Sequence, residues 1–267
     1  MIYKKYERLK ERLASYQKMV IAFSGGVDSS FLLKVAHDVL QENAKALFIS
    51  TPYIARWERE DALSIAREIG APCEVIEKAW LDALRTNPQN RCYVCKHSLF
   101  SALLDSASQQ GFFIVADGSN VDDLKEYRPG RVALQELHIQ SPLVEAELTK
   151  SEIRQLSKEL GLSTWDKPSY ACLLTRFPYE KPISEKALEM VSLAEAYLID
   201  EGYSDMRVRY DNAVARIEMP FTCKTHFIHD VRLDAICAHF KSLGFLHVTL
   251  DLEAYRHDSL NESKQKV

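Results

Sequence analysis

The apolar positions of the first 116 residues follow two spacings in turn. Stretches in which apolar side chains recur every three or four positions predict helices, and short, continuously apolar stretches predict buried strands. The helical stretches are residues 3–16, 31–36, 57–69 and 97–110, and the strand-like runs are residues 19–23, 45–50, 73–76 and 112–116. Strands that alternate with helices of this length predict an α/β fold, in which a parallel sheet carries helices on both faces.

The pattern changes in the second half of the chain. Residues 117–179 are rich in Gly, Pro, Asp and Ser and hold one clear helix, 149–160, in which Thr149 and Glu152 have capping-box spacing. A smaller α+β unit is predicted beyond this region, with helices at 184–201 and 225–243 and strands at 206–210, 213–218 and 247–250. We therefore expect two domains, residues 1–180 and residues 181–267.

Composition and charge narrow the class of protein. The chain has 267 residues, of which 46% are hydrophobic and 27% are charged, as is typical of a globular protein. Its net charge of −4 provides no positive field to attract nucleic acid, so we do not expect a nucleic-acid partner. No apolar run approaches the ~20 residues of a membrane helix. The first residues are charged rather than apolar, and we expect a cytoplasmic protein with no membrane partner.

One turn between a strand and a helix carries the residue types of a phosphate-binding site. Its two glycines let the backbone approach an anion closely, its serines add hydroxyl donors, and the dipole of the following helix favours phosphate. Asp28 fits this turn if it holds Mg²⁺, which bridges phosphate oxygens. The turn is neither a Walker A loop nor a G-x-G-x-x-G motif. The nucleotide-binding residues that we expect are Ala22, Phe23, Ser24, Gly25, Gly26, Val27, Asp28 and Ser29, together with Ser50 and Gly118.

The six cysteines divide into two groups. Cys92 and Cys95 form a C-x-x-C pair in a turn-rich stretch just before a helix, which fits a redox pair, half of a zinc site or two ligands of a cluster. The absence of a second C-x-x-C makes structural zinc the weaker interpretation. Cys172 lies in a second long loop, and three thiolates on one 4Fe-4S cluster would leave one iron open. The other three, Cys73, Cys223 and Cys237, are expected to be small buried core residues.

The segment from Ser24 to Ser29 resembles the SGGxDS signature of the PP-loop ATP pyrophosphatase superfamily. Members of that superfamily bind ATP at this loop on a parallel sheet. They cleave ATP between its α- and β-phosphates, transfer AMP to a carbonyl or carboxylate oxygen and release pyrophosphate. The resemblance therefore implies that ATP and Mg²⁺ bind here.

Further segments narrow the resemblance to the LarE family of ATP-dependent sulfur transferases. Together with residues 24–29, the segments that carry it are 117–120 with Asp123, 127–130, 167–179, 207–209 and 215–218. The resemblance implies that the enzyme adenylates a carboxylate of pyridinium-3,5-dicarboxylate mononucleotide, and that sulfur then displaces AMP to leave a thiocarboxylate for the nickel-pincer cofactor of lactate racemase. In one branch a single cysteine gives up its own sulfur. In the other, which this sequence resembles, three cysteines hold a 4Fe-4S cluster, here Cys92, Cys95 and Cys172.

The substrate of that reaction is itself a nucleotide and needs cationic partners. Arginines on one face of a predicted strand supply guanidinium groups suited to phosphate and carboxylate. The resemblance assigns Asp28 and Cys172 to catalysis, and it also implies a homo-oligomer, often a hexamer. Weaker candidates for metal or substrate contacts are Asp117, Asn120 and Asp123. The substrate residues that we expect are Arg176, Arg207, Arg209, Arg216 and Glu218.

Three other functions remain open from the sequence. PP-loop enzymes with three cluster cysteines also thiolate tRNA, although the negative charge of this chain disfavours that substrate. An amide ligase of the NAD or GMP synthetase kind would use ammonia on the same adenylate, and would give the cysteines no role. A nucleotide sensor without catalytic activity would bind ATP and release no pyrophosphate.

Overall fold

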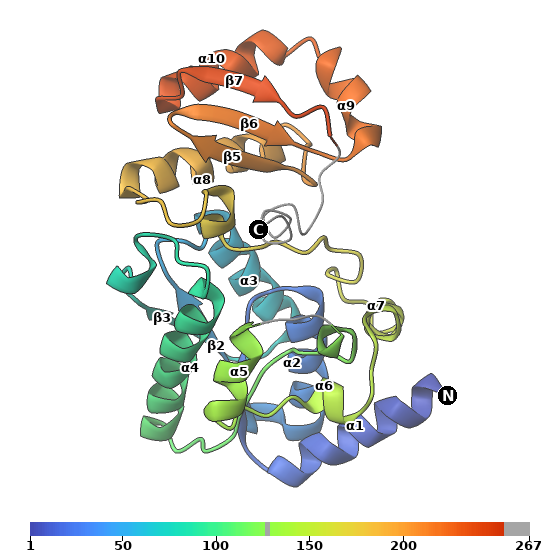
Figure 1. Cartoon of the computed structure of the whole chain (residues 1–267). Helices are drawn as coiled ribbons and strands as arrows, with labels where there is room; N and C mark the ends of the chain where they lie inside the picture. Colours follow the sequence, from blue (N-terminus) through green and yellow to red (C-terminus); the bar gives the residue numbers. More distant parts are fainter. Residues whose placement is uncertain (126–128, 254–267) are drawn as a thin grey trace. The chain divides into compact units, whose positions relative to one another are not determined.

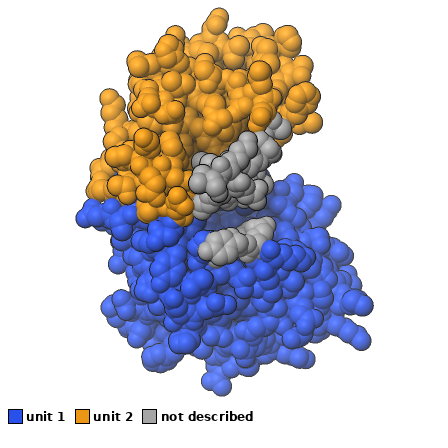
Figure 2. Space-filling model, in the orientation of Figure 1, with its two compact units in different colours: residues 1–84, 90–170 blue, residues 85–89, 171–267 orange. Residues whose placement is uncertain are grey.

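The computed structural model describes residues 1–125 and 129–253, and it divides the chain into two units (Figures 1 and 2). The first unit holds residues 1–84 and 90–170, and the second holds residues 85–89 and the chain from residue 171 onward. The second unit thus starts before the predicted domain boundary at residue 180 and takes in a short segment from the first half. As functional domains, residues 1–180 and 181–267 remain a prediction.

The first unit is built on a parallel sheet of four strands, as predicted. The strand order is β3-β2-β1-β4, and each neighbouring pair runs parallel. Strands β1 and β2 are mostly buried, as is typical of parallel strands that are covered on both faces, whereas β3 is half-buried. Their bounds are β1 Met19–Ala22, β2 Ala44–Ser50, β3 Cys73–Glu77 and β4 Val115–Ala116.

Helices cover both faces of this sheet. Successive residues of a strand point to opposite faces, and the core follows that rule: Met19 and Ile21 pack in one apolar cluster, whereas Val20 packs in another. The first cluster includes residues of α1, α2 and α3, and the second includes Leu103 of α4. The helices are α1 Ile2–Tyr16, α2 Val27–Leu40, α3 Arg56–Ile69, α4 Arg91–Gln109, α5 Pro129–Glu136, α6 Pro142–Glu145 and α7 Lys150–Glu159, with 3₁₀ turns at Gln41–Asn43, Asp82–Leu84 and Asp122–Leu124.

The start of α4 corrects the sequence prediction. The helix begins at residue 91 rather than 97, because the carbonyl of Asn90 accepts hydrogen bonds from the N–H groups of Tyr93 (2.9 Å) and Val94 (3.2 Å). Cys92 and Cys95 are therefore helical, and the expectation that they lie in a turn-rich loop is wrong. Helix α7 has the predicted cap, in which the Thr149 hydroxyl accepts from the N–H of residue 152.

The second unit contains a separate three-stranded sheet in the order β5-β6-β7, with β5 and β6 antiparallel and β6 and β7 parallel. The predicted helix 225–243 is in fact two helices. The chain breaks between them where the Asp230 carboxylate accepts the N–H of Arg232 at 2.8 Å. The elements are a 3₁₀ turn η4 Leu173–Arg176, α8 Glu185–Asp200, β5 Arg207–Asp211, β6 Val214–Glu218, α9 Phe221–Ile228, α10 Leu233–Leu243 and β7 His247–Leu250.

A buried ion pair links η4 to α8 inside the second unit. Arg176 and Glu195 are each 2% exposed, and the guanidinium donates to both carboxylate oxygens at 2.7 and 2.9 Å. Replacing one partner leaves the other charge buried without compensation. We expect Glu195→Gln to lower the free energy of unfolding of this unit by about 3–5 kcal/mol.

The measurement is hydrogen exchange of peptides from α8 and β5, because all three tryptophans of the chain lie in the first unit. The control is Glu185→Gln, which removes an exposed partner of Arg85 at 3.4 Å and should cost less than about 1 kcal/mol. Equal effects of the two substitutions would contradict the prediction.

Candidate active site

The glycine turn joins the end of β1 to the start of α2. Gly25 has a φ of 69°, a conformation that L side chains rarely adopt, and a Cβ built on it would lie 2.8 Å from the Cα of Ala62 in α3. Helix α3 thus packs directly against the turn. The first N–H groups of α2 have no acceptor within the helix, so this end of the helix suits an anion. The cradle fits a nucleotide phosphate.

The serine hydroxyls brace the turn from within. The Oγ atoms of Ser24 and Ser29 lie 3.0 Å apart, and the Ser29 hydroxyl also donates to the Gly26 carbonyl at 3.3 Å. The N–H of Gly26 donates to the Ser24 hydroxyl at 3.4 Å. The two hydroxyls therefore stabilise the shape of the loop.

The remaining expected nucleotide-binding residues lie around the turn. Phe23 and Val27 are buried in the core, Ala22 ends β1, and Ser50 ends the neighbouring strand β2. Gly118 follows β4, and a Cβ at that position would lie 3.0 Å from the backbone nitrogen of Ser29. The carboxyl ends of adjacent parallel strands thus meet at the turn, which is where α/β sheets bind ligands.

Asp28 in the first turn of α2 is held by two partners. Its carboxylate accepts from Lys150 Nζ at 2.5 Å and from the Asn120 side-chain amide at 3.4 Å. Burial raises the pKa of Asp28, while the positive charge of Lys150 acts to lower it and the carboxylate of Asp123 to raise it. A carboxylate beside phosphate-binding N–H groups has the donor chemistry that Mg²⁺ requires.

Lys150 should tune the pH at which this site binds metal. Mg²⁺ binds the ionised carboxylate, so affinity for Mg²⁺-ATP falls as the pH drops through the pKa of Asp28. Lys150→Gln removes the cation that lowers this pKa, and we expect the fall to begin at a higher pH. Calorimetric titration with Mg²⁺-ATP across pH measures the shift. The control is Lys34→Gln. Lys34 lies on α2, as Asp28 does, but pairs with Asp38, so its replacement should leave the profile unchanged. A Lys150→Gln profile identical to wild type would refute the coupling.

A second lysine contacts the turn and was missed by sequence reasoning, as was Lys150. Lys167 Nζ donates to the Gly25 carbonyl at 2.7 Å and forms an ion pair with Asp61 of α3. These lysines lie 122 and 142 positions from their partners in the turn, so no local pattern marks them. Lys167 falls in the family-like segment 167–179, whereas Lys150 lies in the first turn of the predicted helix 149–160, where nothing local marks it.

Among the weaker candidates, Asp117 accepts from the hydroxyls of Ser119 and Ser141, the latter at 2.7 Å. Asp123 accepts the N–H of Asn120 at 3.0 Å. Both carboxylates therefore shape the loop that carries Asn120. Tyr127 and Arg128 of the family-like segment 127–130 lie outside the described residues.

The C-x-x-C pair occupies the first turn of α4. Residues three apart lie on the same side of a helix, so Cys92 and Cys95 share a face. Cys92 is exposed, and Cys95 Sγ lies 3.8 Å from the hydroxyl of the buried Tyr53. Helix α5 crosses closely, since a Cβ on Gly130 would lie 3.2 Å from the Cys92 carbonyl. Two thiols on one helical turn suit a shared metal or cluster.

Cys172 belongs to the second unit and directly precedes η4. The residue is half-buried, and its carbonyl accepts from the Thr175 N–H at 3.0 Å and from the Thr175 hydroxyl at 2.8 Å. Within residues 1–125 and 129–253, no three or more His, Cys, Asp or Glu side chains form a ready metal-binding group. The assignment of Cys92, Cys95 and Cys172 to a cluster therefore stays a prediction.

The predicted arginine face exists on β5 and β6. Arg207 pairs with Glu218 and Arg209 with Arg216 across the two strands, which puts all four side chains on one face of the sheet. Glu218 is buried and bridges Arg209 (2.8 Å) and Arg216 (3.2 Å). Arg209 also donates to the Thr175 carbonyl in η4. This face thus adjoins the segment that follows Cys172.

The arginines differ in how accessible they are. Arg176, Arg207 and Arg209 are buried, and Arg176 is paired with Glu195. Arg216 is about half-exposed at 52% and bridges to Asp251. Arg216 is therefore the member of the expected set best placed to contact a substrate, and Glu195 is the partner that the sequence did not reveal.

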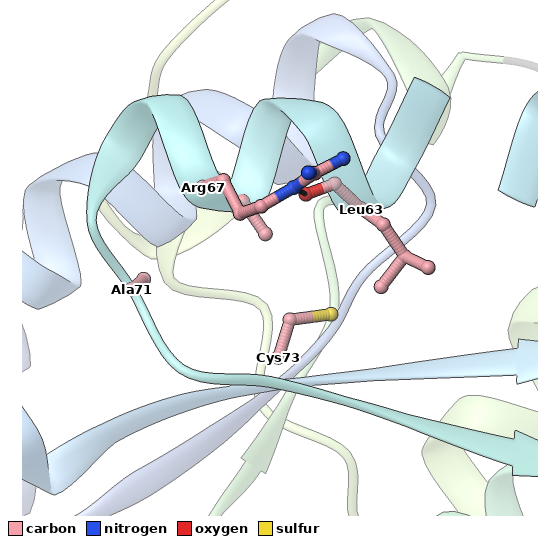
Figure 3. A pocket seen from close by; sticks show the side chains of 5 residues that line it. Leu63, Arg67, Ala71 and Cys73 are labelled. Carbon is pink, nitrogen blue, oxygen red and sulfur yellow. Dashed lines mark hydrogen bonds between the residues drawn. The ribbon is translucent and has the colours of Figure 1, made fainter. Parts of the chain in front are cut away.

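The other three cysteines are half-buried rather than buried, which corrects the expectation for Cys73, Cys223 and Cys237. Cys73 lies in a pocket of about 460 Å³ beside α3 (Figure 3). Burial raises the pKa of the Cys73 thiol to about 11. The raised pKa favours the protonated thiol, which is a weaker nucleophile than the thiolate. Its lining residues are Leu63, Ala66, Arg67, Ala71 and Cys73.

Comparison with known proteins supports the interpretation of the turn. The family model described as NAD synthase matches residues 3–90. A pyridinium-3,5-bisthiocarboxylic acid mononucleotide synthase of Lactiplantibacillus plantarum is 35% identical over 258 residues, which cover 96% of this chain and 93% of that protein. The chain belongs to the LarE family. An uncharacterized protein of Synechocystis is 42% identical over 98% of both chains.

More distant similarity extends to other PP-loop enzymes. A glutamine-hydrolyzing GMP synthase of Helicobacter pylori is 24% identical over 233 residues, covering 73% of this chain and 42% of that protein. Membership of the LarE family confirms both the predicted family and the PP-loop fold of the first unit. None of the helices in the described ranges has the length and apolarity to cross a bilayer.

Proposed function

We propose that this LarE-family enzyme is an ATP-dependent sulfur transferase acting on pyridinium-3,5-dicarboxylate mononucleotide. The observation that carries the proposal is the full-length similarity to the Lactiplantibacillus plantarum synthase, combined with a phosphate-binding turn braced by Ser24 and Ser29. That relative is named as a synthase of a bisthiocarboxylic acid mononucleotide. The same reaction on this chain would serve nickel-pincer cofactor synthesis.

The reaction proceeds in two displacements. A substrate carboxylate oxygen attacks the α-phosphorus of ATP, and the bond to pyrophosphate breaks. A sulfur nucleophile then attacks the acyl carbon, and AMP leaves with the electron pair of the C–O bond, giving a thiocarboxylate. Adenylation is needed because a carboxylate oxygen is itself a poor leaving group. Donors that stabilise charge on the phosphates lower the barrier to the first displacement.

The residues of the first unit have distinct roles in that displacement. The N–H groups of the turn and of the first turn of α2 bind phosphate oxygens. Asp28 would hold Mg²⁺, which would neutralise charge on the phosphates. Lys150, which contacts Asp28 at 2.5 Å, is close enough to share in this neutralisation. Lys167 fixes the Gly25 carbonyl and with it the shape of the loop.

The second displacement uses the cysteines. We assign Cys92, Cys95 and Cys172 as the ligands of a 4Fe-4S cluster, which when bound supplies an open iron to carry the transferred sulfur. Arg216, with Arg209, Arg207 and Glu218 behind it, binds the phosphate or carboxylate of the substrate. Arg176 supports this face through its pair with Glu195.

The direct test is to incubate the purified enzyme, reconstituted anaerobically with iron and sulfide, with Mg²⁺-ATP, sulfide and the dicarboxylate mononucleotide. We expect pyrophosphate, AMP and a product in which sulfur has replaced a carboxylate oxygen, with an intact Cys172 by mass spectrometry. Loss of the mass of hydrogen sulfide from Cys172 would instead indicate a sacrificial cysteine. Absence of pyrophosphate would refute an adenylating enzyme.

Two other functions can be separated from this one, the first by the same assay with ammonium and the second by tRNA binding. The similarity to GMP synthase allows an ammonia-using ligase, which would form an amide with ammonium and ignore sulfide. A tRNA-thiolating enzyme would bind bulk tRNA tightly in a salt-sensitive manner, which the net charge of −4 disfavours. We further propose a cytoplasmic homo-oligomer such as a hexamer, which sedimentation of the purified enzyme would test.

A further inference from the structure

Residues 85–89 form a strap that belongs to the second unit, although the chain on both sides of them belongs to the first. The strap is tied to residues 180–183 by backbone hydrogen bonds. The N–H of Glu180 donates to the Asn87 carbonyl at 3.1 Å, and the N–H of Ile183 donates to the Arg85 carbonyl at 2.8 Å. The Glu180 carboxylate also accepts the N–H of Gln89 at 3.1 Å.

The side chain of Asn87 gathers three carbonyl groups of the opposite segment. Its amide nitrogen lies 3.2, 3.0 and 2.9 Å from the carbonyl oxygens of Leu174, Phe177 and Pro178. Asn87 is 0% exposed, and its bonds to the carbonyls of Leu174 and Phe177 are buried, so loss of the amide donor is costly there. The residue has a φ of 52°, a conformation that asparagine tolerates better than most residues.

The segment that Asn87 binds directly follows Cys172. Leu174 lies two residues after Cys172, and the Cys172 carbonyl accepts the Thr175 N–H, so the Asn87 amide fixes the turn on which this cysteine stands. In the other direction, the strap leads within five residues into the first turn of α4 and to Cys92. The buried amide of Asn87 thus lies shortly before Cys92 and Cys95 in sequence, and it binds the loop that follows Cys172.

We propose that Asn87 is a positioning residue for Cys172. Its side-chain amide binds three carbonyls of the loop that follows Cys172, and in this way it orients the thiol for ligation or sulfur transfer. The role of Cys172 itself rests on the proposed function. The role of Asn87 depends on its N–H donors and not only on its backbone conformation, and substitutions can separate the two.

Asn87→Gly keeps a residue that adopts positive φ readily but removes the donors. Asn87→Asp keeps the shape of the side chain, but turns an oxygen toward three carbonyl oxygens. The control is Gln89→Ala in the same strap, because Gln89 is exposed and contributes its backbone N–H to the contact with Glu180.

The first readout is the alkylation rate of each cysteine by iodoacetamide in iron-free protein, resolved by peptide mass spectrometry. We expect the Cys172 rate to change by about tenfold in Asn87→Gly and more in Asn87→Asp, as loss of a buried hydrogen bond allows. Cys223 and Cys237, in the same unit, should stay within about twofold, and Gln89→Ala should match wild type.

The second readout separates the two chemical steps. Pyrophosphate formation by the Asn87 variants should remain, while thiocarboxylate formation falls by about tenfold. An unchanged Cys172 rate in both variants, or a parallel rise at Cys223 and Cys237, would overturn the positioning role. Because alkylation needs neither ATP nor sulfide, a changed Cys172 rate with no thiocarboxylate from wild type would refute the proposed function and leave the positioning role standing.

Discussion

Replacing Gly25 by alanine should lower the affinity for ATP by at least about 100-fold. Two effects act together. The φ of 69° disfavours any residue with a Cβ, and that Cβ would lie 2.8 Å from the Cα and 2.9 Å from the Cβ of Ala62. The clash is with the backbone of α3 rather than with a flexible side chain, so the turn itself must move. Calorimetric titration with Mg²⁺-ATP measures the loss, and circular dichroism checks that the variant folds.

The chain offers a matched control for backbone strain. Gly161 has a φ of 73°, yet a Cβ there would meet nothing within 4 Å. Gly161→Ala should therefore cost about 1 kcal/mol of stability and leave ATP affinity unchanged. Gly118→Ala, whose Cβ would lie 3.0 Å from the Ser29 nitrogen, should weaken binding by about tenfold. Equal ATP affinity in Gly25→Ala and Gly161→Ala would show that the turn is not the nucleotide site.

Cys172→Ala should uncouple the two steps of the reaction. We expect pyrophosphate formation to stay within about threefold of wild type, because Asp28 and the glycine turn, to which we assign adenylation, belong to the first unit. Thiocarboxylate formation should fall by at least about 1000-fold, since removal of a group that takes part directly in a transfer step has effects of this size.

The control for this substitution is Cys237→Ala, which removes a half-buried thiol from α10 of the same unit and should retain both activities. Charge-transfer absorption after anaerobic reconstitution gives a second measurement, which should be lost in Cys172→Ala and Cys95→Ala and kept in Cys237→Ala. Full thiocarboxylate formation by Cys172→Ala would exclude this cysteine from sulfur transfer.

Local patterns were sufficient where neighbours in sequence decide the structure. The parallel sheet, the capped start of α7 and the glycine turn between β1 and α2 follow from spacing and from residue types within a few positions. The start of α4 was misplaced because chemically suggestive cysteines were assigned to a loop, although Asn90 opens a helix directly before them. The break before α10 was missed because the apolar spacing continues through it, while the turn between the helices is held by a side-chain hydrogen bond of Asp230.

Contacts between distant parts of the chain were beyond such patterns. Lys150 and Lys167 reach the glycine turn from over 120 positions away, and their types alone are those of any surface lysine. The arginine face was found by alternation along a strand, but alternation does not reveal which arginines are buried. Arg176 is buried in an ion pair with Glu195, and Arg209 is buried in an ion pair with Glu218.

The strap of residues 85–89 also restricts how this architecture can be recombined. A fragment that begins at residue 171 contains every helix and strand of the second unit, yet lacks the amide that donates to the carbonyls of Leu174, Phe177 and Pro178. A single crossover between genes, at residue 170 or at residue 180, would therefore transplant an incomplete module. The two units are therefore interleaved in the chain through residues 85–89.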